Sequence, residues 1–163
     1  IHQAKIAADG SLAIYGAECN DGALHLYDRE TGIIRWKFPA PNRHSFRATA
    51  ITGDGKYTGG STLTSGHAYI FSTDANIPLA HWNLNASMGA YDLADDGSFL
   101  ATGGTDNLVH ILERESQKER ASIKTNEFVG EIDISANGQY IAAGTSGSVY
   151  FFESIDTSAP EKE

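Results

Sequence analysis

The stretch LADDGSFLATGGTDNLVHIL, residues 93–112, decides the fold: it reads as a strand end, an Asp-Gly turn, a strand, a second turn and another strand. Asp-Gly and Asn-Gly favour two-residue hairpin turns, because both central positions of such turns need positive φ. The same pattern recurs around Gly10, Gly55, Gly97 and Gly138, at intervals of 45, 42 and 41 residues. The chain therefore consists of four copies of one structural repeat.

A repeat of about 40–45 residues is typical of propeller blades, each a small sheet of four antiparallel strands called A to D. The predicted fold class is all-β, with β-propeller blades at about 1–42, 43–86, 87–126 and 127–154, and an acidic tail or linker at 155–163. No helix longer than two turns is expected. We predict the strands at 2–8, 11–17, 23–28, 33–38; 46–52, 56–62, 67–72, 79–84; 88–94, 98–104, 108–113, 118–124; and 129–135, 139–144, 148–153.

The repeat is incomplete at both ends. Blade one begins in the middle of its A strand, and blade four has no D strand before the polar segment IDTSAPEKE. We expect a partial propeller from a seven- or eight-bladed ring, with the missing blades supplied by a partner chain or an upstream segment, or by self-association of two copies. Apolar residues should then be exposed at the two end faces, namely Ile6, Leu24, Val149 and Phe151.

Composition limits the function. The formal net charge of −9 argues against nucleic acid as a partner, because phosphate binding needs a clustered basic surface. The sequence has no apolar run of the length that a membrane helix needs, and its single cysteine, Cys19, cannot form an internal disulfide. Localisation stays open between cytoplasmic and, if an upstream signal was removed, extracellular or periplasmic.

The segment LYDRETGIIRWKF, residues 26–38, carries a second motif. Asp28, Thr31, Gly32 and Trp36 fit the docking pattern A-x-D-x-x-T-G-x-x-x-W, with Leu26 in place of the alanine. Thr-Gly should form the turn between the C and D strands, and the Trp should span the gap to the next blade. Trp82 in blade two is expected to repeat the role of Trp36 in blade one.

Through this motif and its repeat period, the chain resembles the WD-repeat and quinoprotein-like (PQQ-type) β-propeller superfamily over nearly all of residues 1–154. The resemblance implies two functions. One is a non-enzymatic scaffold that mediates protein–protein interaction, which we prefer. The alternative is a fragment of a quinone-cofactor dehydrogenase, for which the resemblance implies a calcium-and-quinone pocket with adjacent cysteines, and one cysteine cannot supply these.

No residue stands out as catalytic, cofactor-binding or metal-ligating. His25 and His110 would be the best metal pair, but they occupy equivalent C-strand positions where the other blades have Tyr69 and Tyr150, which favours a structural role. The acids at the A–B turns, such as Asp54 and Asp96, are explained by turn formation. The glycine-rich turn GTSGS, residues 144–148, precedes a strand and not a helix, so it lacks the dipole of a phosphate site.

The connections from D to A and from B to C should emerge on one end of the disc, which we call the loop face. They vary between blades while the A–B turns stay uniform, which favours the loop face as the recognition surface. Its predicted partner-binding residues are Asn42, Arg43, His44, Asn85, Ser87, Asp106, Asn107, Asn126 and Glu127, beside Glu18, Asn20, Asp21, Pro41, Thr64, Ser65 and Ser146. Asn85-Ala86-Ser87 also matches the N-glycosylation sequon.

Overall fold

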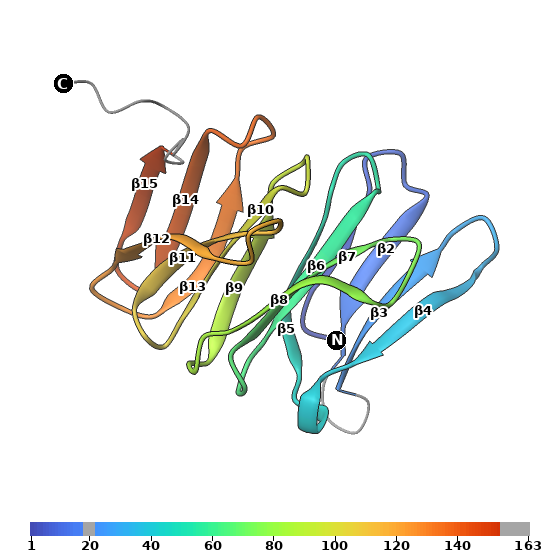
Figure 1. The fold of residues 1–163 in the computed structure, drawn as a ribbon, viewed down its shortest axis with the longest axis horizontal. Coiled ribbons are helices and arrows are strands. Elements are labelled where there is room, and N and C mark those ends of the chain that lie inside the picture. The colour runs from blue at the N-terminus through green and yellow to red at the C-terminus, as the bar shows by residue number, and fades with distance from the viewer. Residues whose placement is uncertain (18–21, 154–163) are drawn as a thin grey trace.

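The computed structural model describes residues 1–17 and 22–153, and Glu18, Cys19, Asn20, Asp21 and the tail lie outside this part. The described residues form four antiparallel sheets that stand side by side (Figure 1). Blade one contains β1 (Ala4–Ile6), β2 (Leu12–Gly16), β3 (Ala23–Asp28) and β4 (Ile33–Pro39); blade two contains β5 (Phe46–Ile51), β6 (Tyr57–Thr62), β7 (His67–Ser72) and β8 (Pro78–Asn83). Blade three contains β9 (Met88–Leu93), β10 (Phe99–Gly104), β11 (Leu108–Glu113) and β12 (Glu119–Lys124); blade four contains β13 (Val129–Ile134), β14 (Tyr140–Thr145) and β15 (Val149–Glu153).

The predicted fold class is confirmed. Every predicted strand is present, and its ends differ from the prediction by two residues or fewer. Within the described residues, the helical element is one 3-10 turn, η1 (Pro41–Arg43). The four A–B turn glycines, Gly10, Gly55, Gly97 and Gly138, all have φ between 67° and 70°, but the Asp or Asn before each of them is not among the residues with positive φ. The expected two-residue turn is therefore wrong: the N–H of each of these glycines donates to the carbonyl three residues earlier, which closes a longer turn that ends in the left-handed glycine.

The blades are arranged in sequence order. The A strands β1, β5, β9 and β13 contact one another in turn, so they line the inner side of the array, while β4, β8 and β12 form its outer edge. Figure 1 shows blade one and blade four at opposite ends of an arc that is not closed.

The hydrophobic core is divided among the gaps between blades. Each of three buried clusters combines residues of two adjacent blades. In the first gap, Leu24, Leu26 and Trp36 of blade one pack with Phe46 and Phe71 of blade two. Because burial of apolar surface is the main stabilising term, each blade depends on its neighbour for stability.

The second gap shows how closely neighbouring blades approach. The hydroxyl of Tyr91 in blade three donates a hydrogen bond to the carbonyl of Tyr69 in blade two, at 2.9 Å. A Cβ at Gly59 would lie 2.2 Å from that hydroxyl oxygen and 2.1 Å from the Tyr69 carbonyl oxygen. Glycine is therefore required at position 59.

The docking motif of blade one forms as expected. The backbone N–H of Thr31 donates to Asp28 Oδ1 at 3.0 Å, and Gly32 has φ of 72°. The Asp28 carboxylate also pairs with Arg35 at 3.1 Å. Trp36 crosses to blade two, where its Nε1 donates to the carbonyl of Thr73 at 2.9 Å and its ring contacts Phe71, with centroids 5.4 Å apart.

Trp82 crosses in the same direction, from blade two to blade three, and its Nε1 donates to the carbonyl of Gln117 at 3.0 Å. Its strand position differs from that of Trp36, however. Trp36 pairs with Leu26, whereas Trp82 pairs with Ala68, which is equivalent to Leu24. Trp82 therefore occupies the position of Phe38, two residues further along the D strand.

The end faces carry three of the four predicted apolar residues. Ile6 of blade one is 64% exposed, and Val149 and Phe151 of blade four are 80% and 70% exposed. The prediction for Leu24 was wrong, because Leu24 points into the gap toward blade two and is fully buried.

Replacing Trp36 tests whether its indole joins blades one and two. The Trp36→Phe substitution should lower the free energy of unfolding by about 1–3 kcal/mol, because the buried Thr73 carbonyl loses its donor. Urea denaturation followed by circular dichroism measures this. Trp82→Phe is the matched control and should have a smaller effect, since its bond is only partly buried. An unchanged midpoint for Trp36→Phe would contradict the role assigned to the indole.

Candidate functional site

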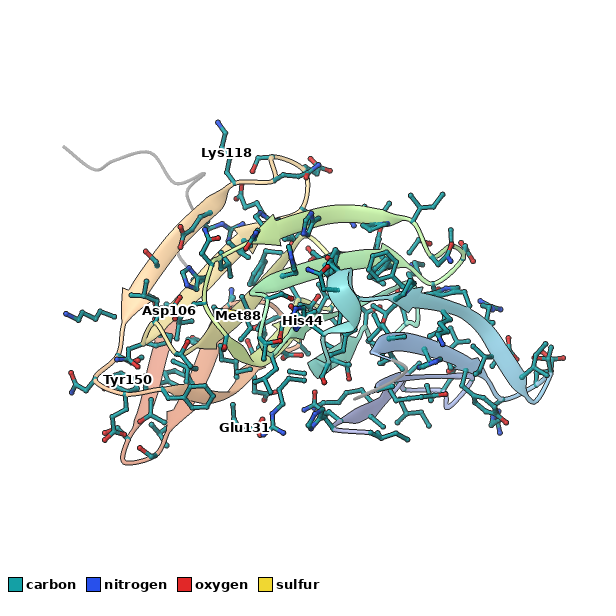
Figure 2. All side chains as sticks on the ribbon, turned by 90° about the horizontal axis from the view of Figure 1, so that it is seen from below. His44, Met88, Asp106, Lys118, Glu131 and Tyr150 are labelled. Atoms are coloured by element: carbon teal, nitrogen blue, oxygen red, sulfur yellow. The ribbon has the colours of Figure 1, made fainter. Side chains whose placement is uncertain are left out.

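The loop face forms as the topology predicts, and Figure 2 looks onto it, with His44 and Asp106 labelled. Three contacts tie a D–A connection to the B–C turn that follows it. In blade two the Thr64 hydroxyl contacts Nδ1 of His44, and in blade three the backbone N–H of Ser87 donates to the Thr105 hydroxyl at 3.1 Å. The third contact, in blade four, joins Glu127 to Ser146 and Gly147.

Glu127 anchors the glycine-rich turn of blade four. The Ser146 hydroxyl and the backbone N–H of Gly147 donate to Glu127 Oε2 at 2.7 and 2.8 Å. The Ser146 bond, followed by the Gly147 bond, lowers the pKa of the Glu127 carboxyl. The turn donors that an external anion would need are therefore occupied by a carboxylate of the chain itself.

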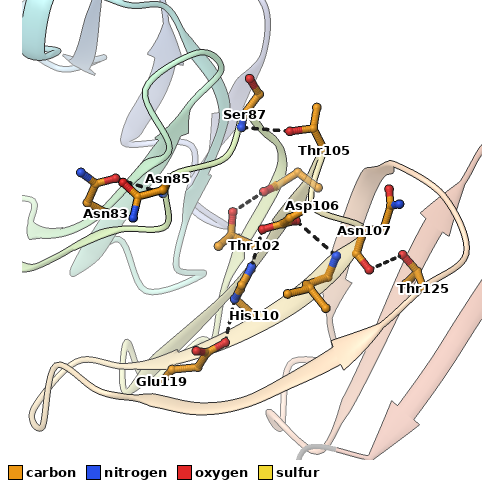
Figure 3. A network of polar contacts seen from close by, with 12 residues as sticks. Asn83, Asn85, Ser87, Thr102, Thr105, Asp106, Asn107, His110, Glu119 and Thr125 are labelled. Carbon is orange, nitrogen blue, oxygen red and sulfur yellow. Dashed lines mark hydrogen bonds and ion pairs between the residues drawn. The ribbon is translucent and has the colours of Figure 1, made fainter.

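In blade three the buried side chain of His110 contacts Asp106, a residue of the loop face (Figure 3). Nε2 of His110 lies 2.9 Å from Asp106 Oδ2, and its Nδ1 lies 2.7 Å from Glu119 Oε1. Asp106 Oδ1 also accepts the backbone N–H of Leu108 at 3.2 Å. Asp106 is thus fixed by two contacts, and both ring nitrogens of His110 are engaged by carboxylates.

His25 occupies the equivalent position in blade one and differs in its surroundings. It is 3% exposed and stacks on Tyr15, with ring centroids 4.7 Å apart and planes inclined by 15°. Tyr69 and Tyr150 stand at the same position in blades two and four. The two histidines are therefore equivalent residues of separate blades, and the structure does not bring them together as a site.

The predicted partner-binding residues divide by accessibility. Asn42 and Asn85 are exposed, with φ of 54° and 55°, and Asn107 is partly buried, with φ of 60°. Asn126 is exposed, while Ser87 and Asp106 are partly buried and bonded within the face. Arg43 lies in η1, and its side chain is outside the described part of the structure. Glu18, Asn20 and Asp21 also lie outside it.

A depression lies at the other end of the array. It has a volume of about 590 Å³ and runs between the A–B turns of blades three and four. Its lining includes Asp96, Arg120, Asn137, Tyr140 and Glu153. Arg120 is held there by an ion pair with Glu113 at 2.8 Å. This end of the array is the competing candidate for a binding surface.

Two features were missed by the sequence analysis. One is the pair His67 and His81, which lie 14 residues apart and meet because β7 and β8 are antiparallel neighbours. The other is Asp92, on the inner strand of blade three. Strand alternation shows on which face of its sheet each of these residues lies. It predicts that His67 meets His81, or that Asp92 meets Ile134, only when the register between the strands is known.

Among the described acids with a shifted pKa, Asp92 is the one whose pKa is raised. Burial raises the pKa of its carboxyl to about 6. Its Oδ2 accepts the backbone N–H of Ile134 in blade four at 2.7 Å, beside a cavity of about 200 Å³. A raised pKa marks a functional candidate when a reacting partner is near. The cavity beside Asp92 is lined by apolar side chains and Asp95, and the charges of Asp133 and Lys5 act on the Asp92 carboxyl in opposite directions. We therefore assign it to the contact between blades.

Asp92 should make stability depend on pH. Its pKa is raised in the folded protein, so its contribution is fully present below about pH 4 and is lost as the pH rises to about 6. Asp92→Asn should therefore stabilise the protein by up to about 3 kcal/mol at pH 7, with little gain at pH 4. Urea unfolding at both pH values measures the difference. Glu131→Gln, at an exposed position of the A strand of blade four, is the control. An equal gain for Asp92→Asn at both pH values would contradict the assignment.

Comparisons with known proteins do not add a family. No protein-family model and no curated protein matches the sequence.

Within residues 1–17 and 22–153, no group of three or more His, Cys, Asp or Glu side chains is arranged to hold a metal ion. No helix in this part of the chain is long and apolar enough to cross a membrane.

Proposed function

We propose that the chain is a non-enzymatic β-propeller scaffold of the WD-repeat or PQQ-like kind, which mediates protein–protein interaction through its loop face. The observation that carries this proposal is the bonding of each D–A connection to the neighbouring B–C turn, through His44, Ser87 and Glu127. Loops fixed in this way lose little conformational entropy when a partner binds, which favours recognition.

The chemistry of the face supports a protein partner. Its exposed groups include the amides of Asn42, Asn85 and Asn126, which both donate and accept hydrogen bonds. They project from loops that differ between blades, whereas the A–B turns repeat one sequence pattern. The net charge of −9 disfavours phosphate-rich partners.

The loop face can be tested without distorting its backbone. Asn42→Gly and Asn85→Gly remove the amides while keeping residues that tolerate positive φ, and Asn126→Ala completes the variant. Affinity capture with quantitative mass spectrometry should show that proteins enriched by the wild type are lost with this triple variant. The matched control, Asp54→Asn with Asp96→Asn at the opposite end, should retain them.

Two outcomes would contradict the proposal. Retention by the loop-face variant, with loss in the Asp54 and Asp96 control, would place the binding surface at the A–B turn end. An absorbance band from bound quinone in the native protein would favour the alternative of a quinone-cofactor dehydrogenase fragment. Circular dichroism melting of all variants establishes that they are folded.

The end faces indicate a further partner, which is another blade. The interior residues equivalent to Val149 are Leu24, Ala68 and Val109, and those equivalent to Phe151 are Leu26, Ile70 and Ile111; all six are fully buried by the next blade. Blade four presents the same face without cover among the described residues. We propose blade one of a second copy as the occupant of this face; the alternatives are a blade from a partner chain or from an upstream segment.

A polar contact supports the second copy as the occupant. Asp92 in blade three accepts the backbone N–H of Ile134 in blade four. Asp133 of blade four is the repeat equivalent of Asp92, and Ile6 of blade one is the equivalent of Ile134. Both Asp133 and Ile6 are exposed, so the Asp133 carboxylate of one copy can accept the Ile6 N–H of the next.

Sedimentation equilibrium tests this head-to-tail contact. The wild type should self-associate, whereas Phe151→Asp and Ile6→Asp should each be monomeric, because each damages one of the two faces. Mixing these two variants should restore a one-to-one complex, since one undamaged face of each kind remains. Ile77→Asp, at a residue 71% exposed on the outer edge, should associate like the wild type. A monomeric wild type would overturn the contact.

A further inference from the structure

Blade two carries two histidines on one face of its sheet, near the loop face. His67 begins β7 and His81 lies in β8, where it pairs in register with Tyr69. His67 and His81 are therefore diagonal neighbours across the two strands. Nδ1 of His67 lies 2.8 Å from Nε2 of His81.

Neighbouring groups hold the two rings in place. Tyr69 stacks on His81, with ring centroids 4.5 Å apart and planes inclined by 7°. The backbone N–H of His67 donates to the Thr62 hydroxyl at 2.9 Å. Preorganised imidazoles lose less freedom when they bind a common ligand.

Both rings can bind an ion only when they are uncharged. An uncharged imidazole has a lone pair on one nitrogen, and this lone pair is what a metal ion binds.

We propose that His67 and His81 form a two-histidine site for a divalent copper-class ion, with Cu²⁺ preferred over Ni²⁺ and Zn²⁺. Two nitrogens bound at about 2.0–2.1 Å lie about 2.8–3.0 Å apart when the bonds meet at 90°, and about 3.3–3.4 Å apart in a tetrahedral site. The observed 2.8 Å is the length of a hydrogen bond between the two rings, so it shows that both nitrogens can reach one ion but does not set the angle at that ion. The preference for Cu²⁺ follows from the Irving–Williams order, in which nitrogen ligands bind Cu²⁺ more tightly than Ni²⁺ or Zn²⁺.

Binding also requires a change of protonation. In the metal-free pair, one ring donates an N–H to the other across the 2.8 Å contact. For both nitrogens to bind the ion, that proton must move to the other nitrogen of its ring or leave to solvent. Water completes the coordination, because in the part of the chain described no third ligand of the His, Cys, Asp or Glu type joins the pair.

Titration of the native chain with Cu²⁺ tests this site by calorimetry and electron paramagnetic resonance. The wild type should bind one equivalent with hyperfine splitting from two imidazole nitrogens, and more tightly than it binds Ni²⁺ or Zn²⁺. His67→Asn and His81→Asn should each weaken binding at least about tenfold, because changing even outer partners of a ligand has an effect of this size.

His2→Asn is the matched control, because it removes one imidazole from blade one, outside β7 and β8. This variant should keep the two-nitrogen signal. Loss of the signal in His2→Asn and its persistence in His81→Asn would overturn the proposal, as would tighter binding of Zn²⁺ than of Cu²⁺. The site does not depend on the proposed scaffold function, so either can fail alone.

Discussion

The burial of one blade against the next is the interaction on which the rest of the structure depends. No blade has a core of its own: the apolar side chains of the C strand in one sheet meet the A and C strands of the following sheet. At about 25 cal/mol per Å² of apolar surface, each gap supplies stabilisation that an isolated four-stranded sheet lacks. The loop positions follow from this packing, because the D–A connections cross the gaps and are bonded to the turns beside them.

The division of residues between the two faces of each blade explains which predictions succeeded. Turn chemistry and period-two alternation were sufficient for the strands, because both are local properties of the sequence. They do not say which face of a C strand meets the preceding blade and which meets the following one. Leu24 was therefore predicted to be exposed although it lies in the first gap, while Phe151, on the equivalent face of blade four, is exposed.

The candidate sites were less predictable than the fold, since they depend on register between strands. His67 and His81 become neighbours only through the pairing of β7 with β8, and Asp92 meets Ile134 across 42 residues. The membership of the loop face could be predicted from topology alone, because alternating connections of an antiparallel sheet emerge at opposite ends. The bonds within the face, such as that of Glu127 to the GTSGS turn, could not.

The two indoles also differ in a way that bears on how such a chain evolves. Trp36 and Trp82 stand two residues apart in the repeat, about 6.6 Å along a strand, and their acceptors differ as well, being the first residue after β7 and the fourth after β11. A blade duplicated or exchanged by recombination would arrive with its indole out of line with the acceptor of its new neighbour. Each junction is therefore specific for the two blades that it joins. Recombination that changed the order of the blades would break these hydrogen bonds.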